Sequence, residues 1–163
     1  MTPEERLVAA LRDARLTFAL AESCTGGLVA SRVTRVVHAS DALRGALVTY
    51  TDEAKAELLG IDRALLASKG AVTKEVAREM ATRVRELLAT DLAVSVAGFA
   101  GPNVPPGGER GLVFLGVAHW GGVEVHEMRY AGDREKVREA ATQDALRFAL
   151  EAIPKTRAAL GQA

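Results

Sequence analysis

The sequence lacks the features by which several large classes of protein are recognised. It has one cysteine, Cys24, in 163 residues, so neither an intrachain disulfide nor a cysteine-cluster metal site can form. Its three histidines do not have the spacing of metal ligands, and no zinc-protease, EF-hand or P-loop motif occurs. We therefore expect no metal site.

The chain has no excess of either charge, few aromatic residues and no long apolar run. The 21 Lys and Arg residues balance the 21 Asp and Glu residues, and aromatics make up 4%. A net charge of zero argues against electrostatic binding to nucleic acid or anionic membranes, and few aromatics argue against a base-stacking surface. No apolar run approaches the ~20 residues of a membrane span, and Arg12, Asp13 and Arg15 interrupt any signal peptide. These absences predict a soluble, cytoplasmic protein with no membrane partner and no direct nucleic-acid partner.

The length and composition are those of one globular domain. Hydrophobic residues make up 48% of the chain and charged residues 26%, which is ordinary for a soluble fold. The sequence has no internal repeat, low-complexity tract or linker, so residues 1–163 are expected to form a single domain.

Apolar periodicity and turn residues predict helices and strands in alternation through the first two thirds of the chain. Helices are expected over 2–14, 28–37, 52–59, 62–70 and 73–88, and buried strands over 16–21, 45–50 and 92–96. The glycine- and proline-rich segment 98–111 is expected to be a loop. A hairpin over 112–130, with its second strand at the sheet edge, and a helix over 133–153 ended by Pro154 follow, with a frayed tail from 155. The pattern predicts a three-layer α/β/α fold with a mixed, mostly parallel sheet and a C-terminal β-hairpin.

The segment Glu22–Gly27 is the first candidate for chemistry. Ser23, Cys24 and Thr25 lie between a buried strand and the start of a helix, where free backbone N–H groups gather. Such a turn suits a phosphate or the oxyanion of an acyl transfer. The alternative is that Ser23 or Thr25 only caps the helix.

Two basic residues near the starts of predicted helices are further candidates. Lys55 lies one turn into a helix, where the helix dipole and partial burial lower an amine's pKa and suit it as a general base. The alternative is a solvated lysine beside Asp52. Arg134 opens the last helix and is either a phosphate ligand or a surface arginine. Cys24 is a rival nucleophile or a small buried residue.

Several motifs together resemble the CinA C-terminal domain family, which includes nicotinamide-nucleotide amidases. The resemblance covers about residues 7–153 and is carried by six segments in the family order: 21–27 (AESCTGG), 48–50 (VTY), 53–55 (EAK), 70–73 (GAVT), 98–102 (GFAGP) and 132–134 (GDR).

The resemblance implies an amidohydrolase that converts nicotinamide mononucleotide to nicotinate mononucleotide and ammonia, a reaction of NAD recycling, with no metal or cofactor. It implies that Ser23 is the nucleophile, that Lys55 is its base and that Tyr50 hydrogen-bonds within that pair. The expected partner is a small nucleotide, and a homo-oligomer is left open. The expected substrate-binding residues are Thr25, Gly26, Gly27, Gly98, Ala100, Gly101 and Arg134.

Three departures from the family pattern favour a weakened enzyme or a changed substrate. Ala97 stands where the family usually has Thr or Ser, Asp52 stands where it has Asn, and the loop 103–111 differs from the usual glycine-rich stretch. The alternative function is therefore a catalytically inactive module that binds a nucleotide or a protein in competence or DNA-damage responses.

Overall fold

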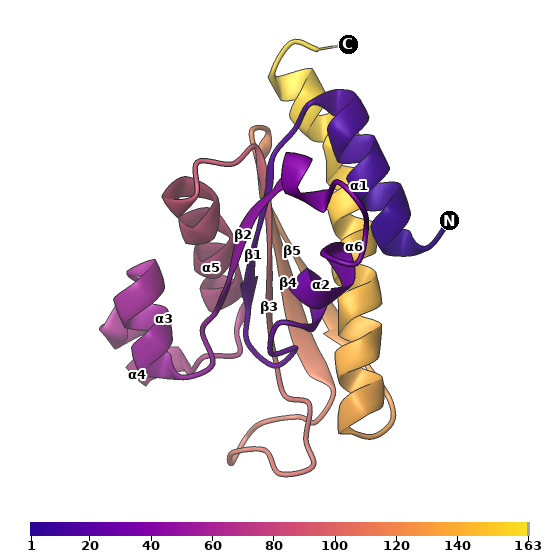
Figure 1. Ribbon diagram of the computed structural model, residues 1–163. Coiled ribbons are helices and arrows are strands. Elements are labelled where there is room, and N and C mark those ends of the chain that lie inside the picture. Colours follow the sequence, from indigo (N-terminus) through magenta and orange to yellow (C-terminus); the bar gives the residue numbers. More distant parts are fainter. Residues whose placement is uncertain (163) are drawn as a thin grey trace.

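Five strands form one sheet in the order β2-β1-β3-β4-β5 in the computed structural model, which describes residues 1–162 (Figure 1). The strands are β1 Phe18–Glu22, β2 Leu43–Val48, β3 Leu92–Gly98, β4 Leu112–His119 and β5 Gly122–Arg129. Strand β1 pairs in parallel with β2 and β3, whereas β3–β4 and β4–β5 are antiparallel. The expected mixed sheet, the C-terminal hairpin and the edge position of its second strand are confirmed.

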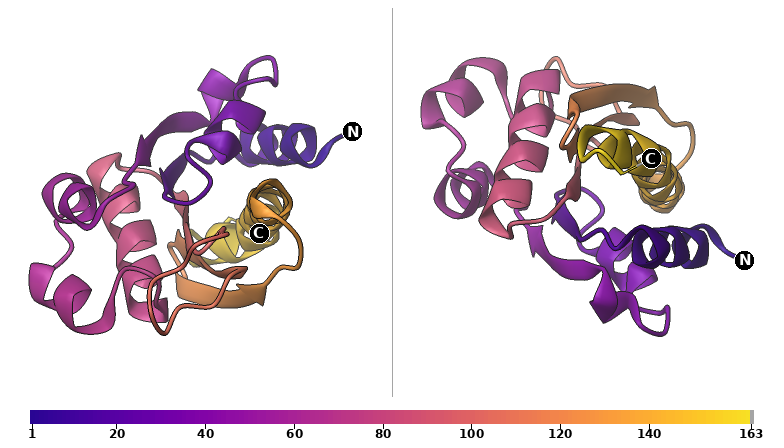
Figure 2. Two further views of the ribbon diagram at one scale, coloured as in Figure 1. Left: turned by 90° about the horizontal axis from the view of Figure 1, so that it is seen from below. Right: turned by 90° about the horizontal axis from the view of Figure 1, so that it is seen from above.

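Helices cover both faces of the sheet, which confirms the three-layer fold (Figures 1 and 2). They are α1 Pro3–Ala14, α2 Leu28–Val33, α3 Asp52–Leu59, α4 Arg63–Lys69, α5 Lys74–Leu87 and α6 Arg134–Ala159, with a 3₁₀ turn η1 at Ala39–Asp41. One buried cluster fills the space between the sheet and α1, α2 and α6, and a second lies under α3, α4 and α5. Strand β1 is buried at all five positions because it lies in the middle of this arrangement.

Two helix ends differ from the sequence-based expectation. Helix α2 stops at Val33 rather than 37, since the run of β-branched residues that follows favours helix weakly. Helix α6 continues through Pro154 to Ala159, so the prediction of a frayed tail from 155 is wrong for that stretch. Ile153 and Thr156 are buried, and the Thr156 hydroxyl donates to the Ala152 carbonyl at 2.9 Å. Packing of the helix outweighs the one hydrogen bond that proline removes.

The parallel strands β1, β2 and β3 all end at one edge of the sheet. The turn after β1, the segment after β2, the loop 99–111 and the start of α6 come together there, at the bottom of Figure 1 and facing the viewer in the left panel of Figure 2. Ligands of open α/β sheets bind at the carboxyl ends of the strands, so this edge is the place to examine for a site.

Candidate active site

Ser23 and Lys55 meet at this edge. Ser23 directly follows β1, and Lys55 lies in the first turn of α3. The Lys55 Nζ atom is 3.2 Å from the Ser23 Oγ atom and donates to the Thr49 carbonyl at 2.9 Å. Lys55 is only 2% exposed, so the reading of this residue as a solvated surface lysine is wrong. The structure places the predicted nucleophile and its predicted base within hydrogen-bond reach.

The surroundings of Lys55 favour the uncharged amine. Burial lowers the pKa of Lys55 from its ordinary value, and the nearby Asp52 carboxylate opposes this by raising it. Both hydrogen-bond acceptors of the amine, the Thr49 carbonyl and the Ser23 hydroxyl, are neutral. A neutral amine has two N–H groups and one lone pair. It can therefore donate to Thr49 and accept the proton of Ser23.

Cys24 is poorly suited to be the nucleophile. The residue is 6% exposed, and burial raises the pKa of its thiol to about 11. Because the thiolate is the reactive form, a thiol with this pKa is almost entirely protonated and inert near neutral pH. The structure supports the interpretation of Cys24 as a small buried residue beside Ser23.

The backbone amides at the start of α2 are not free, which corrects the expectation for Gly26 and Gly27. The buried Glu22 carboxylate accepts from the amides of Gly27, Val29 and Ala30 at 2.8–3.1 Å. The Gly26 amide donates to the Ser23 carbonyl at 2.9 Å. A carboxylate of the protein therefore occupies the position that we predicted for a phosphate, as the positive helix end favours.

Polar groups without partners remain around Ser23. The hydroxyls of Thr25 and Thr49 are buried and form no hydrogen bond with the rest of residues 1–162. The Thr25 amide likewise has no acceptor within this part of the chain. Buried polar groups are almost always satisfied in folded proteins, so this concentration beside a nucleophile indicates a place where another molecule supplies the partners.

Tyr50 forms a hydrogen bond with Arg134, whereas the family resemblance implied one with Ser23 or Lys55. The Tyr50 hydroxyl accepts from Arg134 at 2.7 Å, and Arg134 also donates to the Gly101 carbonyl at 2.7 Å. No hydrogen bond joins Tyr50 to Ser23 or Lys55 among the described residues. Tyr50 is more than half exposed. Arg134 therefore links the segment after β2 to the loop after β3.

Other predicted residues have packing roles. A side chain at Gly98 would come within 2.5 Å of Val113, so glycine permits β3 and β4 to approach closely. Ala100 is buried in the cluster under α1, α2 and α6. Ala97 is 1% exposed and belongs to the cluster on the α3–α5 face. The Ser23 amide donates to the carbonyl of Val96 at 3.0 Å, so Ala97 is nevertheless next to the nucleophile turn.

Sequence reasoning missed three residues of this region. Glu22 holds the amides of α2, Thr49 supplies an acceptor for Lys55, and Arg138 donates to the carbonyls of Cys24 and Thr25. The one available signal for Arg138 was its spacing of four residues from Arg134, which places both on one face of a helix.

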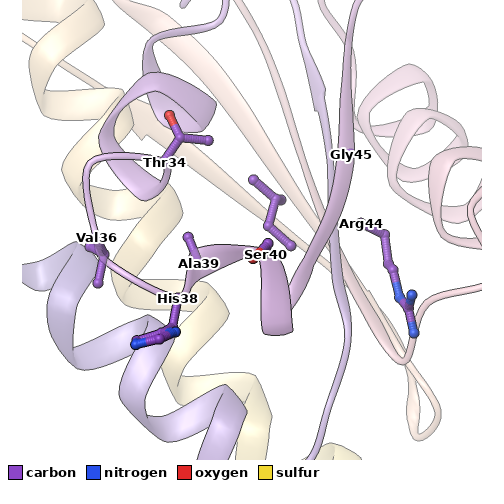
Figure 3. Close-up of a pocket in the computed structure, with 8 residues that line it drawn as sticks. Thr34, Val36, His38, Ala39, Ser40, Arg44 and Gly45 are labelled. Atoms are coloured by element: carbon purple, nitrogen blue, oxygen red, sulfur yellow. The ribbon is translucent and has the colours of Figure 1, made fainter.

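A pocket of about 460 Å³ lies elsewhere, between the end of α2, η1 and the start of β2 (Figure 3). Its lining includes His38 and Arg44, whose side chains point away from each other in Figure 3. It contains none of the predicted site residues, because it adjoins the start of β2 and the site adjoins its end. Within residues 1–162, no helix has the length and apolarity of a membrane span, and no His, Cys, Asp or Glu group suits a metal ion.

Comparison with known proteins agrees with these features. The model of the CinA C-terminal domain matches residues 1–153. The chain belongs to this family. A CinA-like protein of Geobacter sulfurreducens is 47% identical over 139 residues, which cover 83% of this chain and 33% of that protein. A CinA-like protein of Kosmotoga olearia is 40% identical over 151 residues, which cover 92% and 37%. The chain thus spans about a third of these curated relatives' length.

Solved structures of CinA proteins share the whole fold. A CinA superfamily protein from Klebsiella pneumoniae 700603 matches with a TM-score of 0.90 and 30% identity, covering 94% of this chain and 96% of that one. A competence/damage inducible protein from Agrobacterium tumefaciens matches with a TM-score of 0.88 and 34% identity, covering 93% of both chains. The match to the family model begins at residue 1 and ends at 153, close to the expected span of 7–153.

Proposed function

We propose that this CinA domain is an amidohydrolase that converts nicotinamide mononucleotide to nicotinate mononucleotide and ammonia. The observation that carries the proposal is the buried Lys55 amine, 3.2 Å from the Ser23 hydroxyl and with only neutral hydrogen-bond acceptors. A serine hydroxyl is a weak nucleophile unless a base is beside it. The family resemblance supplies the substrate, a carboxamide on a nucleotide.

The reaction proceeds in two halves. Lys55 takes the hydroxyl proton as the Ser23 oxygen bonds to the carboxamide carbon and the carbonyl oxygen becomes an oxyanion. Lys55 returns the proton to the nitrogen, the C–N bond breaks and ammonia leaves an ester on Ser23. Water, deprotonated by Lys55, then attacks the ester, and the acid and free Ser23 are released. One water is consumed and no electrons are transferred.

The unpartnered groups of Thr25 and Thr49 suit the rest of the reacting amide. The Thr25 amide lies two residues after the proposed nucleophile and has no acceptor within the described chain, so it is a candidate donor to the oxyanion, together with the Cys24 amide. The buried hydroxyls of Thr25 and Thr49 can exchange hydrogen bonds with the carboxamide nitrogen. A hydroxyl both donates and accepts, so it suits an amide and the acid that replaces it.

Arg134 is the candidate ligand of the substrate phosphate. Its two hydrogen bonds go to neutral oxygens, those of Gly101 and Tyr50, and no carboxylate of the described residues pairs with it. Arginine binds phosphate well because its planar donors match the oxygens. Since Glu22 occupies the start of α2, the phosphate is assigned to the Arg134 side.

The alternative is a nucleotide-binding domain without catalysis. It is favoured by Ala97, which offers no hydroxyl beside the nucleophile turn, and by the altered loop 103–111. Both alternatives use Arg134, so binding alone does not separate them.

The deciding experiment is ammonia release from nicotinamide mononucleotide by the purified chain. We expect turnover in wild type, a loss of at least about 10³-fold in Ser23→Ala and near-normal turnover in the matched variant Cys24→Ala. Nucleotide binding without ammonia release would favour the alternative. Normal turnover in Ser23→Ala with loss in Cys24→Ala would make the thiol the nucleophile.

A further inference from the structure

Arg138 forms two hydrogen bonds with the turn that begins at Ser23. Its Nε atom donates to the Cys24 carbonyl at 3.2 Å, and its Nη2 atom donates to the Thr25 carbonyl at 3.0 Å. The contact joins residues 113 and 114 positions apart in the chain. One rigid, planar guanidinium thus holds two successive carbonyls, which fixes their orientation more firmly than two separate donors would.

Arg138 belongs to α6, so the donor of these hydrogen bonds is held by an element other than the turn. Helix α6 has 26 residues and packs along the sheet and α1 (Figure 1). Arg138 is one turn beyond Arg134, so both face the same edge of the sheet. The side chain of Arg138 is 24% exposed, and its third nitrogen donates to Glu135 at 2.8 Å. A well-anchored helix therefore controls the geometry of the loop.

The hydrogen bond from Arg138 to the Cys24 carbonyl determines the direction of the Thr25 amide. In a trans peptide the C=O and N–H groups point in opposite directions. Holding the Cys24 carbonyl toward α6 therefore turns the Thr25 N–H away from α6. That N–H, like the Cys24 N–H, has no acceptor in another residue of the described chain. If the peptide were free to rotate, this donor would have no fixed direction.

We propose that Arg138 is a positioning residue, which orients the Cys24–Thr25 peptide so that Ser23 and the Thr25 amide act on the same reacting group. The inference rests on the proposed function through the use of Ser23 as nucleophile and of the Thr25 amide as a donor to the oxyanion, and not through the identity of the substrate. Arg138 does not touch the reacting atoms, so its effect appears in the rate of bond formation at Ser23. Displacing a catalytic group by about 1 Å is enough to cost on the order of 100-fold in rate.

The test measures the reaction of Ser23 with a fluorophosphonate, which needs no knowledge of the natural substrate. In this reaction the Ser23 oxygen bonds to phosphorus, fluoride leaves and the hydroxyl proton passes to Lys55. We expect Arg138→Ala to react about 10–100-fold more slowly than wild type. Arg138→Lys should fall between them, because an ammonium cannot form the two-pronged contact.

The matched control is Arg32→Ala. Arg32 also joins α2 to α6, through Glu139 at 2.6 Å, but it forms no hydrogen bond or ion pair with residues 23–27 within the described part of the chain. We expect its reaction rate to equal that of wild type. Melting temperatures by circular dichroism accompany each rate. Ethylguanidinium, which can fill the space left in Arg138→Ala, should restore part of the rate without changing the melting temperature.

Equal probe rates in wild type and Arg138→Ala, whether both react or neither does, would overturn the inference. A slower rate that neither lysine nor ethylguanidinium improves, with a lowered melting temperature, would reduce Arg138 to a structural role and also overturn it. Wild type that reacts with the probe but releases no ammonia from nicotinamide mononucleotide would remove the proposed substrate. The probe rates would then still decide the role of Arg138.

Discussion

Lys55 and Asp91 lie near opposite ends of strand β1. The surroundings of Asp91 stabilise its charged form, whereas those of Lys55 disfavour the charged amine. Asp91 accepts from the Thr17 amide and hydroxyl at 2.8 and 2.7 Å and from the Trp120 indole at 3.0 Å. Burial raises the pKa of Asp91, but the hydrogen bonds from Trp120 and Thr17 outweigh it and the pKa is lowered. Arg85 stacks on the Trp120 ring at 4.2 Å. Every contact favours the charged carboxylate.

Lys55 has no charged hydrogen-bond partner, and the Asp52 charge only partly opposes the effect of burial on its pKa. Its amine is buried, contacts two neutral oxygens and has its pKa lowered by burial. The contrast teaches that polarity alone does not mark function in this fold. At one end of β1 the network stabilises a charge and joins β1, β3 and the hairpin. At the other end, burial lowers the pKa of the Lys55 amine, which suits the amine to its proposed role as a base.

Lys55→Met is the change with the largest expected effect. It should reduce kcat for ammonia release by at least about 10³-fold, because no other basic side chain of the described residues forms a hydrogen bond with the Ser23 hydroxyl. It should change the melting temperature little, since the gain from replacing a poorly solvated amine by an apolar side chain of similar length offsets the loss of the donor to the Thr49 carbonyl. Steady-state kinetics and thermal melts measure both. Unfolding of the variant would show that Lys55 is a structural residue and would break the comparison.

Asp91→Ala should have the reverse signature. Removing the carboxylate leaves the two donors of Thr17 and the Trp120 indole without their acceptor, which should lower the free energy of unfolding by about 1–3 kcal/mol. We expect kcat to stay unchanged. Because the folded pKa of Asp91 lies below 3.8, wild type should lose this contribution as pH falls below that value, and the variant should not. Urea unfolding at several pH values checks this, and a large fall in kcat would contradict it.

Ala97→Thr would add a hydroxyl beside the nucleophile turn. If that hydroxyl bonds the substrate, kcat/KM for nicotinamide mononucleotide should rise by up to about tenfold. The control is Ala93→Thr, which adds the same group to the same buried cluster but four residues away. Steady-state kinetics of both variants decide the matter. A wild type that is already efficient, with no gain in Ala97→Thr, would show that position 97 does not limit the reaction.

Asp52→Asn should have the smallest effect. The Asp52 charge raises the pKa of Lys55, so its removal should lower that pKa further. The rising limb of the kcat/KM pH profile, where Lys55 loses its proton, should move to lower pH by less than about one unit, because solvent screens an exposed charge. Glu53→Gln removes the neighbouring charge, which does not act on Lys55, and should leave the profile in place. Equal shifts in both variants would contradict a specific effect of Asp52.

Much of the fold follows from sequence patterns. The buried run around β1 and the capped helix α5 have local causes and form where expected. The hairpin also forms, with its turn at residues 120 and 121, one residue before the expected Gly121–Gly122. The proximity of Ser23 and Lys55 also follows, because parallel strands bring the segments after β1 and β2 to one edge. Family resemblance, rather than spacing, selected this serine over Cys24.

The parts that were missed depend on contacts across long separations. Glu22 was counted with the motif, but nothing local indicates that its carboxylate bends back to the amides of Val29 and Ala30. Arg138 is one of many arginines, and only the docking of α6 brings it to residues 24 and 25. Pro154 predicts a helix end from local rules, whereas burial of Thr156 prolongs the helix.

The Glu22 carboxylate has a consequence for ligand orientation. A glycine turn that opens a helix is where many α/β proteins bind phosphate, but here the protein carries its own anion in that position. For the proposed substrate, a second anion at this turn is unfavourable, so we expect the phosphate of the nucleotide to lie away from it. We therefore expect the nucleotide to enter with its phosphate away from the turn and its carboxamide toward Ser23. The Glu22 carboxylate thus sets the orientation in which we expect a phosphorylated substrate to reach Ser23.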